Sequence, residues 1–425
     1  MEADPVANAL EDVLKEADTD YKRSTGSQLQ ELEFRLYSTL HELKRLSYPQ
    51  KPQGVLFVDS GFKTYETDVN VIRYMEIAGI YRDHEGKIVD CGTHVDSLVI
   101  YASRYRVSDV YDLRIYFRPV ETLILKSDIS RASLISQELT RAVRKFFPSG
   151  IKRPHIFKRF VNYLTGLLEL AYAAKLYVML KEGKGLDPIV VIDGSLMRWF
   201  AIKRVTEIDG IDVLEILTGL SEGEIIRFLE RVAGLSKTTK LTNLLRVKRL
   251  LSEKGVNENE EVFGIFNQNA MDNIVLRDTE SIYQALREHV KVYNRLVYQR
   301  RGIWSVRSPV KVADGSIYMV DVYSNSPVVT VKKSSIIVNG EAVKAVNEKL
   351  ESYIPAIFAY REKLLGLSPT GYMQVDLAAR VGGNKSVALD ISLVKAMSRV
   401  PESEVSKALA LLLVSQSTLK RYGYK

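Results

Sequence analysis

Three acidic side chains stand where a metal ion could bind. Asp59 ends the apolar run 54–59 and Asp193 ends the apolar run 189–193, and each is followed at once by serine and glycine. Glu169 lies in the apolar helical pattern 164–180, where an ionised carboxylate costs on the order of several kcal/mol unless it is paired. The alternatives are that each aspartate only shapes a turn and that Glu169 pairs with a distant basic side chain.

Together these three carboxylates would form a site built from oxygen ligands alone. Such a ligand set suits Mg²⁺ or Mn²⁺ and not zinc. Two such ions about 3.5–4 Å apart can activate a water molecule and stabilise the leaving oxygen of a phosphodiester. We therefore expect Asp59, Glu169 and Asp193 to converge on one site that holds Mn²⁺ or Mg²⁺, with two ions per site.

The elements that must position these residues are strands at first and alternating strands and helices afterwards. This order predicts an α/β protein with a mixed sheet flanked by helices. The predicted strands are 54–59, 69–82, 94–102, two short strands within 111–126, 189–192 and several within 303–338. The predicted helices are 7–48, 129–147, 156–181, much of 195–300, and 341–364.

Composition limits the class of protein. The 425 residues suffice for two or three domains, and 60 basic against 52 acidic residues give a net charge of +8, which suits a polyanionic partner. The single cysteine, Cys91, excludes an intramolecular disulfide and a cysteine-rich zinc site. The acidic N-terminus carries no apolar signal core and the apolar runs are too short or too charged to span a bilayer, so we expect a cytoplasmic protein without membrane contact.

Two stretches are rich in basic residues and contain no acid. A cationic groove with aromatic side chains is how single-stranded nucleic acid is held without sequence preference. We expect DNA to bind along these stretches, above all at Lys152, Arg153, Arg300 and Arg301, although solvated helix faces would explain them too. The stretches are 141–168, with Arg141, Arg144, Lys145, Lys152, Arg153, Lys158 and Arg159, and 289–313, with Lys291, Arg295, Arg300, Arg301, Arg307, Lys311 and the aromatic residues Tyr293, Tyr298 and Trp304.

A leucine stripe in the N-terminal segment predicts a packing face. Its members recur at spacings of three and four, which is the period of one helix face. This face packs either in the core of the chain or against a second copy in a homodimer. The stripe consists of Leu29, Leu32, Leu36, Leu40 and Leu43.

Four motifs in order resemble the NurA family, archaeal and bacterial nucleases with a ribonuclease H-like core. Gly54–Gly61 is similar to the family's first strand, and Leu167–Ala173 to its Leu-Glu-x-x-Ala helix. Ile189–Leu196 resembles its most specific motif, and Gly234–Thr238 its downstream Ser-Lys-Thr. The resemblance implies that Asp59, Glu169 and Asp193 bind metal, and it places Lys237 near a DNA phosphate, unless Lys237 is a solvated lysine at a helix end.

The family closes its site with a C-terminal Gly-Tyr-Pro…Ala-His segment. Gly371 and Tyr372 match its start, and Ala379 matches its alanine, but Arg380 stands where the histidine belongs and Met373 replaces the proline. Arginine has no lone pair for a metal, yet it can clamp a phosphate oxygen, and Asp376 could replace the missing ligand. Tyr372 and Arg380 therefore join the three carboxylates as candidate catalytic residues.

The resemblance also implies the organisation and the activity. We expect an N-terminal helical region (1–50), a nuclease core (51–240), a helical insertion (241–300) and C-terminal α+β elements (301–425). The implied function is a metal-dependent 5′–3′ exonuclease, or single-strand endonuclease, for DNA end resection in recombinational repair beside a HerA-type hexameric ATPase. Residues 234–238 lack the spacing of a phosphate-binding loop, so no nucleotide cofactor is expected. The alternative is a catalytically weak or inactive DNA-binding subunit of the same fold, because the histidine is missing.

Overall fold

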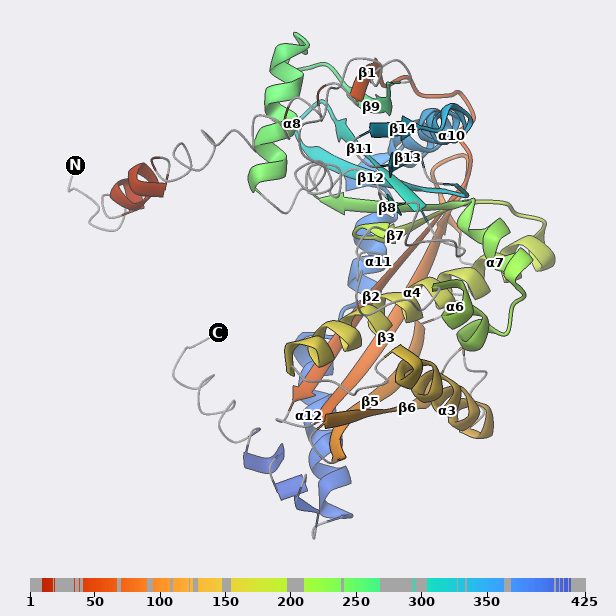
Figure 1. Cartoon of the computed structure of the whole chain (residues 1–425), viewed down its shortest axis with the longest axis vertical. Helices are drawn as coiled ribbons and strands as arrows, with labels where there is room; N and C mark the ends of the chain where they lie inside the picture. The colour runs from red at the N-terminus through yellow and green to blue at the C-terminus, as the bar shows by residue number, and fades with distance from the viewer. Residues whose placement is uncertain are drawn as a thin grey trace. The chain divides into compact units, whose positions relative to one another are not determined.

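The structure is a computed structural model of the whole chain (Figure 1). The side chains of 103–113, 129–131, 139, 142–146, 154–160, 163, 293–294, 304, 329–332, 335–338 and 362 are outside the description. The described residues are 10–17, 19, 34, 38, 41–66, 70–89, 95–107, 110–121, 123–124, 129–146, 154–196, 210–237, 241–267, 293–294, 304–326, 328–332, 335–362, 368–400, 403–404, 406–407, 409–411 and 413.

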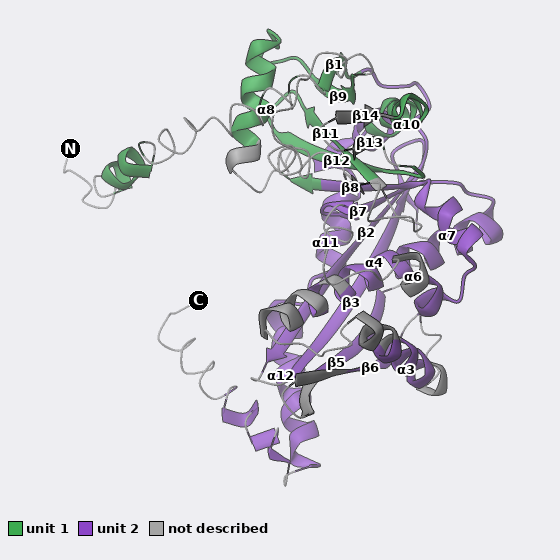
Figure 2. Cartoon of the chain, viewed as in Figure 1, with its two compact units in different colours: residues 1–46, 236–300, 304–354 green, residues 47–235, 301–303, 355–425 purple. Residues whose placement is uncertain are grey.

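The chain forms two compact units, which Figure 2 shows in green and purple. Unit 1 comprises 1–46, 236–300 and 304–354, and unit 2 comprises 47–235, 301–303 and 355–425. Both units are therefore assembled from segments far apart in the sequence. The predicted division into the segments 1–50, 51–240, 241–300 and 301–425 stays a prediction.

Unit 2 is built on a mixed sheet. Its strands lie in the order β8-β7-β2-β3-β5-β6, and the short strand β4 pairs with β3. The pairs β8–β7 and β7–β2 are parallel, whereas β2–β3, β3–β5 and β5–β6 are antiparallel. The strands are β2 (Val55–Glu66), β3 (Asn70–Arg82), β4 (Ile88–Val89), β5 (Val95–Val107), β6 (Val110–Glu121), β7 (Ile189–Asp193) and β8 (Val232–Lys237).

Helices lie on both faces of this sheet, so the predicted α/β class with a mixed sheet flanked by helices is confirmed. Successive residues of β2 point to opposite faces. Ser60 contacts the long helix α4 (Pro154–Lys184), whereas Lys63 and Tyr65 contact α12 (Gly383–Ser398) on the other face. The other helices of unit 2 are α3 (Ile129–Phe146), α6 (Gly210–Thr218), α7 (Glu222–Leu229) and α11 (Tyr372–Ala379).

Unit 1 contains a second group of strands, in the order β1-β9-β11-β12. The helix α8 (Leu241–Glu253) packs on it through an apolar cluster that includes Phe34, Val247 and Leu250. The strands are β1 (His41–Arg45), β9 (Val262–Phe266), β11 (Trp304–Lys311) and β12 (Ile317–Ser324), and the smaller strands are β10 (Tyr293–Asn294), β13 (Val329–Lys332) and β14 (Ser335–Val338). The helix α10 (Gly340–Phe358) begins in unit 1 and ends in unit 2, where β15 (Arg361–Glu362) and β16 (Ser368–Pro369) follow.

Several predicted elements are confirmed and some are wrong. The helices 129–147 and 156–181 match α3 and α4, and the strand 189–192 matches β7. The helix over 7–48 is wrong for His41–Arg45, which form β1 beside β9, with His41 buried and Leu43 half-buried in alternation. The two strands expected within 111–126 are one long strand, β6, and the helical region 195–300 contains the strands β8 and β9.

Leu43 is the one residue of the leucine stripe that the structure describes. It packs within the chain against the cluster around Leu250, and the rest of the stripe lies outside the described residues. The predicted homodimer therefore stays a prediction. Across the described residues, none of the helices combines the length and the apolar character needed to cross a membrane.

Candidate active site

Asp59 and Asp193 lie at corresponding positions of two adjacent parallel strands. The register of β2 and β7 pairs Val58 with Ile192, so the next residue on each strand is one of the two aspartates. Asp59 is only 8% exposed, whereas Asp193 is exposed where β7 ends. The turn after β7 is fixed by the Gly194 amide, which donates to the Leu235 carbonyl oxygen over 2.8 Å. The strand order thus brings together two carboxylates that are 134 residues apart.

The electrostatics of this pair are unfavourable without a cation. Burial raises the pKa of Asp59 from 3.8 to about 7, and the negative charges of Asp193 and Asp376 add to the rise. The Ser60 amide, which donates to Asp59 Oδ1 over 2.7 Å, and the charge of Arg380 oppose this rise. The excess of negative charge beside a buried carboxylate is the condition in which a divalent cation binds.

Tyr372, the first residue of α11, contacts Asp193 directly. Its hydroxyl donates a hydrogen bond to Asp193 Oδ1 and lies 3.4 Å from the Leu235 carbonyl oxygen. The ring is 6% exposed and meets the Phe57 ring edge to face, with 6.4 Å between the ring centroids. Gly371 before it has φ +100°, and a Cβ there would lie 2.7 Å from Phe57 Cδ2, so only glycine fits. This explains the Gly-Tyr pair of the sequence motif.

The end of α11 lies against β2 beside Asp59. Gly61 faces this helix, and a Cβ on Gly61 would collide with the Ala379 carbonyl group. Arg380 follows at once and donates from Nη2 to Asp376 Oδ2 over 2.7 Å, while its side chain stays 58% exposed. Asp376 and Arg380 are four residues apart at the end of α11, and whether Asp376 binds a metal stays a prediction. Both charges act on Asp59, as its pKa shows.

A buried arginine fixes the segment that leads into α11. Arg82 of β3 is fully buried and donates to the carbonyl oxygens of Ala356 (2.6 Å) and Ile357 (3.0 Å). It also reaches the Thr370 carbonyl oxygen over 3.4 Å, one residue before Gly371. Burial lowers the pKa of Arg82 to about 10, so it stays charged at neutral pH. Sequence reasoning missed Arg82, because nothing local distinguishes it from any other basic residue at a strand end.

Glu169 approaches β2 from the face opposite to Asp59. Its Oε2 accepts a hydrogen bond of 2.5 Å from the Ser60 hydroxyl, and Ser60 and Asp59 are successive residues of a regular strand. The carboxylate is 6% exposed, as the apolar pattern predicted. Among the described residues, no group of three His, Cys, Asp or Glu side chains is placed to hold a metal ion. A metal site made of all three predicted carboxylates stays a prediction.

The predicted DNA-binding residues are described only in part. Lys152, Arg153, Arg300 and Arg301 lie outside the described residues, and Lys237 is exposed as the last residue of the strand β8, not at a helix end.

Two basic residues of the stretch 289–313 are in the interior of unit 1. Arg307 pairs with the buried Asp321 over 2.7 Å, and Lys311 donates to the Glu260 carbonyl oxygen over 2.7 Å. These two residues serve the fold, so the DNA-binding prediction for them is wrong. Both were predicted from local charge alone, which does not distinguish a buried basic side chain from a solvated one.

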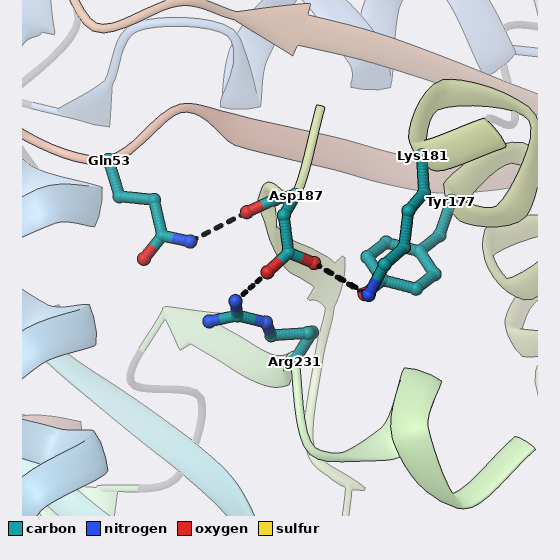
Figure 3. Close-up of polar contacts among 5 residues, drawn as sticks. All are labelled: Gln53, Tyr177, Lys181, Asp187 and Arg231. Carbon is teal, nitrogen blue, oxygen red and sulfur yellow. Dashed lines mark hydrogen bonds and ion pairs between the residues drawn. The ribbon is translucent and has the colours of Figure 1, made fainter. Parts of the chain in front are cut away.

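A second charged cluster lies just before the start of β7, at the end opposite to Asp193 (Figure 3). Asp187 accepts a hydrogen bond of 2.5 Å from the Tyr177 hydroxyl, and it pairs with Arg231 and, over 3.4 Å, with Lys181. The Gln53 amide donates to the Asp187 carbonyl oxygen over 2.6 Å. Two cations thus balance this aspartate, in contrast to the unbalanced pair at the other end of the strand.

Comparison with known proteins gives structural matches only. No protein-family profile and no curated protein sequence matches the chain. A crystal structure of the NurA nuclease from Sulfolobus solfataricus aligns over 93% of this chain and 98% of that one, with 12% identity and a TM-score of 0.39. NurA bound to dAMP and manganese aligns over 90% and 94%, with 9% identity and a TM-score of 0.37. Both TM-scores are below 0.5.

Proposed function

We propose that this chain is a metal-dependent phosphodiester hydrolase that acts on DNA. The observation that carries the proposal is the pair Asp59 and Asp193 at corresponding positions of adjacent strands. Burial of Asp59 and the charge of Asp193 raise the pKa of Asp59 despite the opposing charge of Arg380. Structural carboxylates are usually balanced as Asp187 is, whereas functional sites retain such an imbalance.

The residues present fit a divalent cation. Mg²⁺ is usually held by one or two carboxylates, with water and substrate phosphates as further ligands. Asp59 and Asp193 supply these two carboxylates, and Asp376 lies near enough to act on Asp59. When bound, Mn²⁺ or Mg²⁺ supplies the positive charge that lowers the pKa of a water and stabilises the leaving oxygen. One ion on the two aspartates is the arrangement that the geometry favours, and a second ion depends on Glu169 or Asp376.

The neighbouring residues orient this pair and the phosphate. Tyr372 holds one oxygen of Asp193 and leaves the other carboxylate oxygen for a ligand. Arg380 shares one nitrogen with Asp376 and presents its exposed guanidinium beside Asp59, where parallel N–H groups can bind a phosphate oxygen. The chain therefore offers a cation site and a phosphate contact on adjacent elements.

The decisive experiment is digestion of plasmid and of end-labelled DNA with Mn²⁺, with Mg²⁺ and with EDTA. We expect cleavage with either metal and none with EDTA. Asp193→Asn keeps the size of the side chain but removes a charge, and should lower cleavage by about 100-fold or more. Asp12→Asn, a change of an exposed helical residue, is the matched control and should cleave as wild type. Cleavage by Asp193→Asn at the wild-type rate would refute the proposal.

The second candidate is a DNA-binding subunit that does not cleave. Arg380 favours it, because a permanent positive charge stands beside Asp59, and so does the absence of a three-residue metal cluster among the described side chains. Binding of DNA in EDTA without cleavage in any metal would support this candidate. The same digestion therefore separates the two functions.

The motif resemblance supports a more specific proposal. We propose that the substrate is a DNA end, processed 5′–3′ for recombinational repair by a homodimer beside a HerA-type hexameric ATPase. Co-purification with such an ATPase, and stimulation of end cleavage by ATP only in its presence, would test the partnership. Light scattering that gives the mass of one chain would contradict the homodimer.

A further inference from the structure

A cationic groove lies at the far edge of the unit 2 sheet, between β6 and α3. It is a cavity of about 400 Å³, lined among others by Arg114, Tyr116, Ser133, Gln137, Thr140 and Arg141. None of the described residues that line it is acidic. The groove therefore combines positive charge with polar donors from a strand and a helix.

The walls of this groove are fixed by hydrogen bonds. The Phe117 amide donates to Ser136 Oγ over 3.0 Å, and the Ile115 amide donates to Thr140 Oγ1 over 3.3 Å. Side chains of α3 thus satisfy amides on the outer edge of β6, so α3 lies along this edge (Figure 1). An edge strand covered in this way does not pair with another strand. The groove is preformed, which lowers the entropic cost of binding.

Tyr116, which lines the groove, belongs to an aromatic surface that continues beyond it. The Arg114 and Arg118 guanidinium groups stand 5.6 Å and 5.9 Å from the Tyr116 ring centroid, and the Tyr101 ring lies 5.8 Å from the Tyr116 ring. Both arginines are exposed, and both tyrosines are half-buried. Exposed cations around adjacent aromatic rings are the chemistry that holds single-stranded nucleic acid, through phosphate contacts and base stacking.

This aromatic surface is on the same face of the sheet as Asp59. Directly paired residues share a face, and the register places Tyr65, Ile72, Tyr101 and Tyr116 in one row across β2, β3, β5 and β6. Tyr65 is six residues from Asp59, so it shares its face. Three strand spacings and six residues of strand separate Asp59 from Tyr116 by about 25 Å. The groove is thus distinct from the candidate active site.

We propose that the β6–α3 groove is a binding site for single-stranded DNA. Tyr116 stacks on a base, Arg114 and Arg141 contact phosphates, and Ser133 and Gln137 donate hydrogen bonds to the same strand. The proposal rests on the proposed function only in the choice of DNA as the nucleic acid, because the groove binds the strand without cleaving it. The groove includes residues that the sequence analysis did not single out. Arg114, Tyr116 and Arg118 precede both basic stretches, and only Arg141 belongs to one of them.

The test is fluorescence anisotropy of a labelled oligo-dT with the full chain in EDTA, over a series of salt concentrations. Stacking is worth about 1–3 kcal/mol per base, so Tyr116→Ala should weaken binding about 5- to 150-fold, and Tyr116→Phe should retain it. Arg114→Gln with Arg141→Gln should reduce the slope of log affinity against log salt by about 1.4, at about 0.7 for each phosphate of a single strand. Lys184→Gln, an exposed lysine at the end of α4, is the charge control and should leave binding unchanged.

Ultraviolet crosslinking of the wild-type chain tests the same contact if Tyr116→Ala folds poorly. A bromodeoxyuridine oligonucleotide should crosslink wild type at the peptide that contains Tyr116. Equal affinity of Tyr116→Ala and wild type, no crosslink in this peptide, or an equal loss for duplex and single-stranded DNA would each overturn the proposal. Loss of cleavage in Asp193→Asn with unchanged oligo-dT binding would support the groove as a separate binding site. The proposed hydrolase activity and the proposed binding groove can therefore be refuted independently.

Discussion

Replacing Asp59 by asparagine should stabilise unit 2 at neutral and alkaline pH when no metal is present. The structure holds this carboxyl group 8% exposed beside Asp193, which raises its pKa to about 7. A rise from 3.8 to about 7 means that the folded chain loses about 4 kcal/mol of stability above pH 7, because each pKa unit is about 1.4 kcal/mol. Asparagine has the shape of the protonated acid and never ionises, so Asp59→Asn should recover up to about this amount.

The sign follows from which state binds the proton. Below about pH 4 Asp59 is protonated in the folded and the unfolded chain, and wild type and variant should be equally stable. Between about pH 4 and pH 7 only the unfolded chain loses the proton, so the folded wild type loses stability as the pH rises. Above pH 7 both states are ionised and the difference stays constant.

Hydrogen exchange of peptides covering β2, measured in urea and EDTA from pH 4 to pH 8, follows unit 2 separately from unit 1. Exchange rates are corrected for their intrinsic pH dependence. Asp12→Asn serves as the control, and its pH profile should parallel that of wild type. Mn²⁺ should stabilise wild type above pH 7 and have little effect on Asp59→Asn, because the ion replaces the proton on the aspartate pair. A variant that is no more stable than wild type at pH 8, or a wild type that gains stability relative to the variant from pH 4 to pH 7, would refute the electrostatic reasoning.

Three other substitutions test the neighbours of this pair. Tyr372→Phe removes the hydrogen bond to Asp193 and should cost about 1–2 kcal/mol in urea unfolding and lower cleavage by about 10-fold, with the Mn²⁺ requirement increased. Ser60→Ala removes the hydrogen bond to the buried Glu169 and should destabilise unit 2 by about 1–3 kcal/mol, whereas oligo-dT binding in EDTA should not change. Arg380→Ala should raise the pKa of Asp59, because Arg380 lowers it, and should weaken DNA binding. Arg380→His should raise metal affinity or cleavage. Equal cleavage by both variants and wild type would show that position 380 does not touch the reacting phosphate.

Much of the fold follows from local patterns. The apolar runs at 54–59 and 189–193 predict buried strands, and the helices α3 and α4 lie where helical patterns were predicted. β1 was missed because Leu43, half-buried in a short strand, also fits the helical spacing of the leucines before it. β6 is one strand that contains Pro119, and its pairing with β5 shifts register between Ser97 and Leu98; the sequence pattern did not distinguish this strand from two short ones.

The candidate site is predictable where a residue type is rare in its context. An aspartate that ends an apolar strand is such a residue, and so is a glutamate inside an apolar helix. The sequence does not show toward which face of the sheet each side chain points. Asp59 and Ser60 are adjacent in the chain but contact different layers, so the partner of Glu169 became visible only in the folded chain.

The electrostatic effect of Arg380 depends on its partner Asp376. In sequence, an arginine beside a metal site argues against cleavage, because it brings a permanent positive charge and no lone pair. In the fold, Arg380 donates to Asp376, and the two act on Asp59 in opposite directions. Burial and the charge of Asp193 still raise the pKa of Asp59, so a cation beside the two aspartates remains favourable. Arg380 is therefore compatible with the cation site that we propose, and its exposed guanidinium suits the proposed phosphate contact.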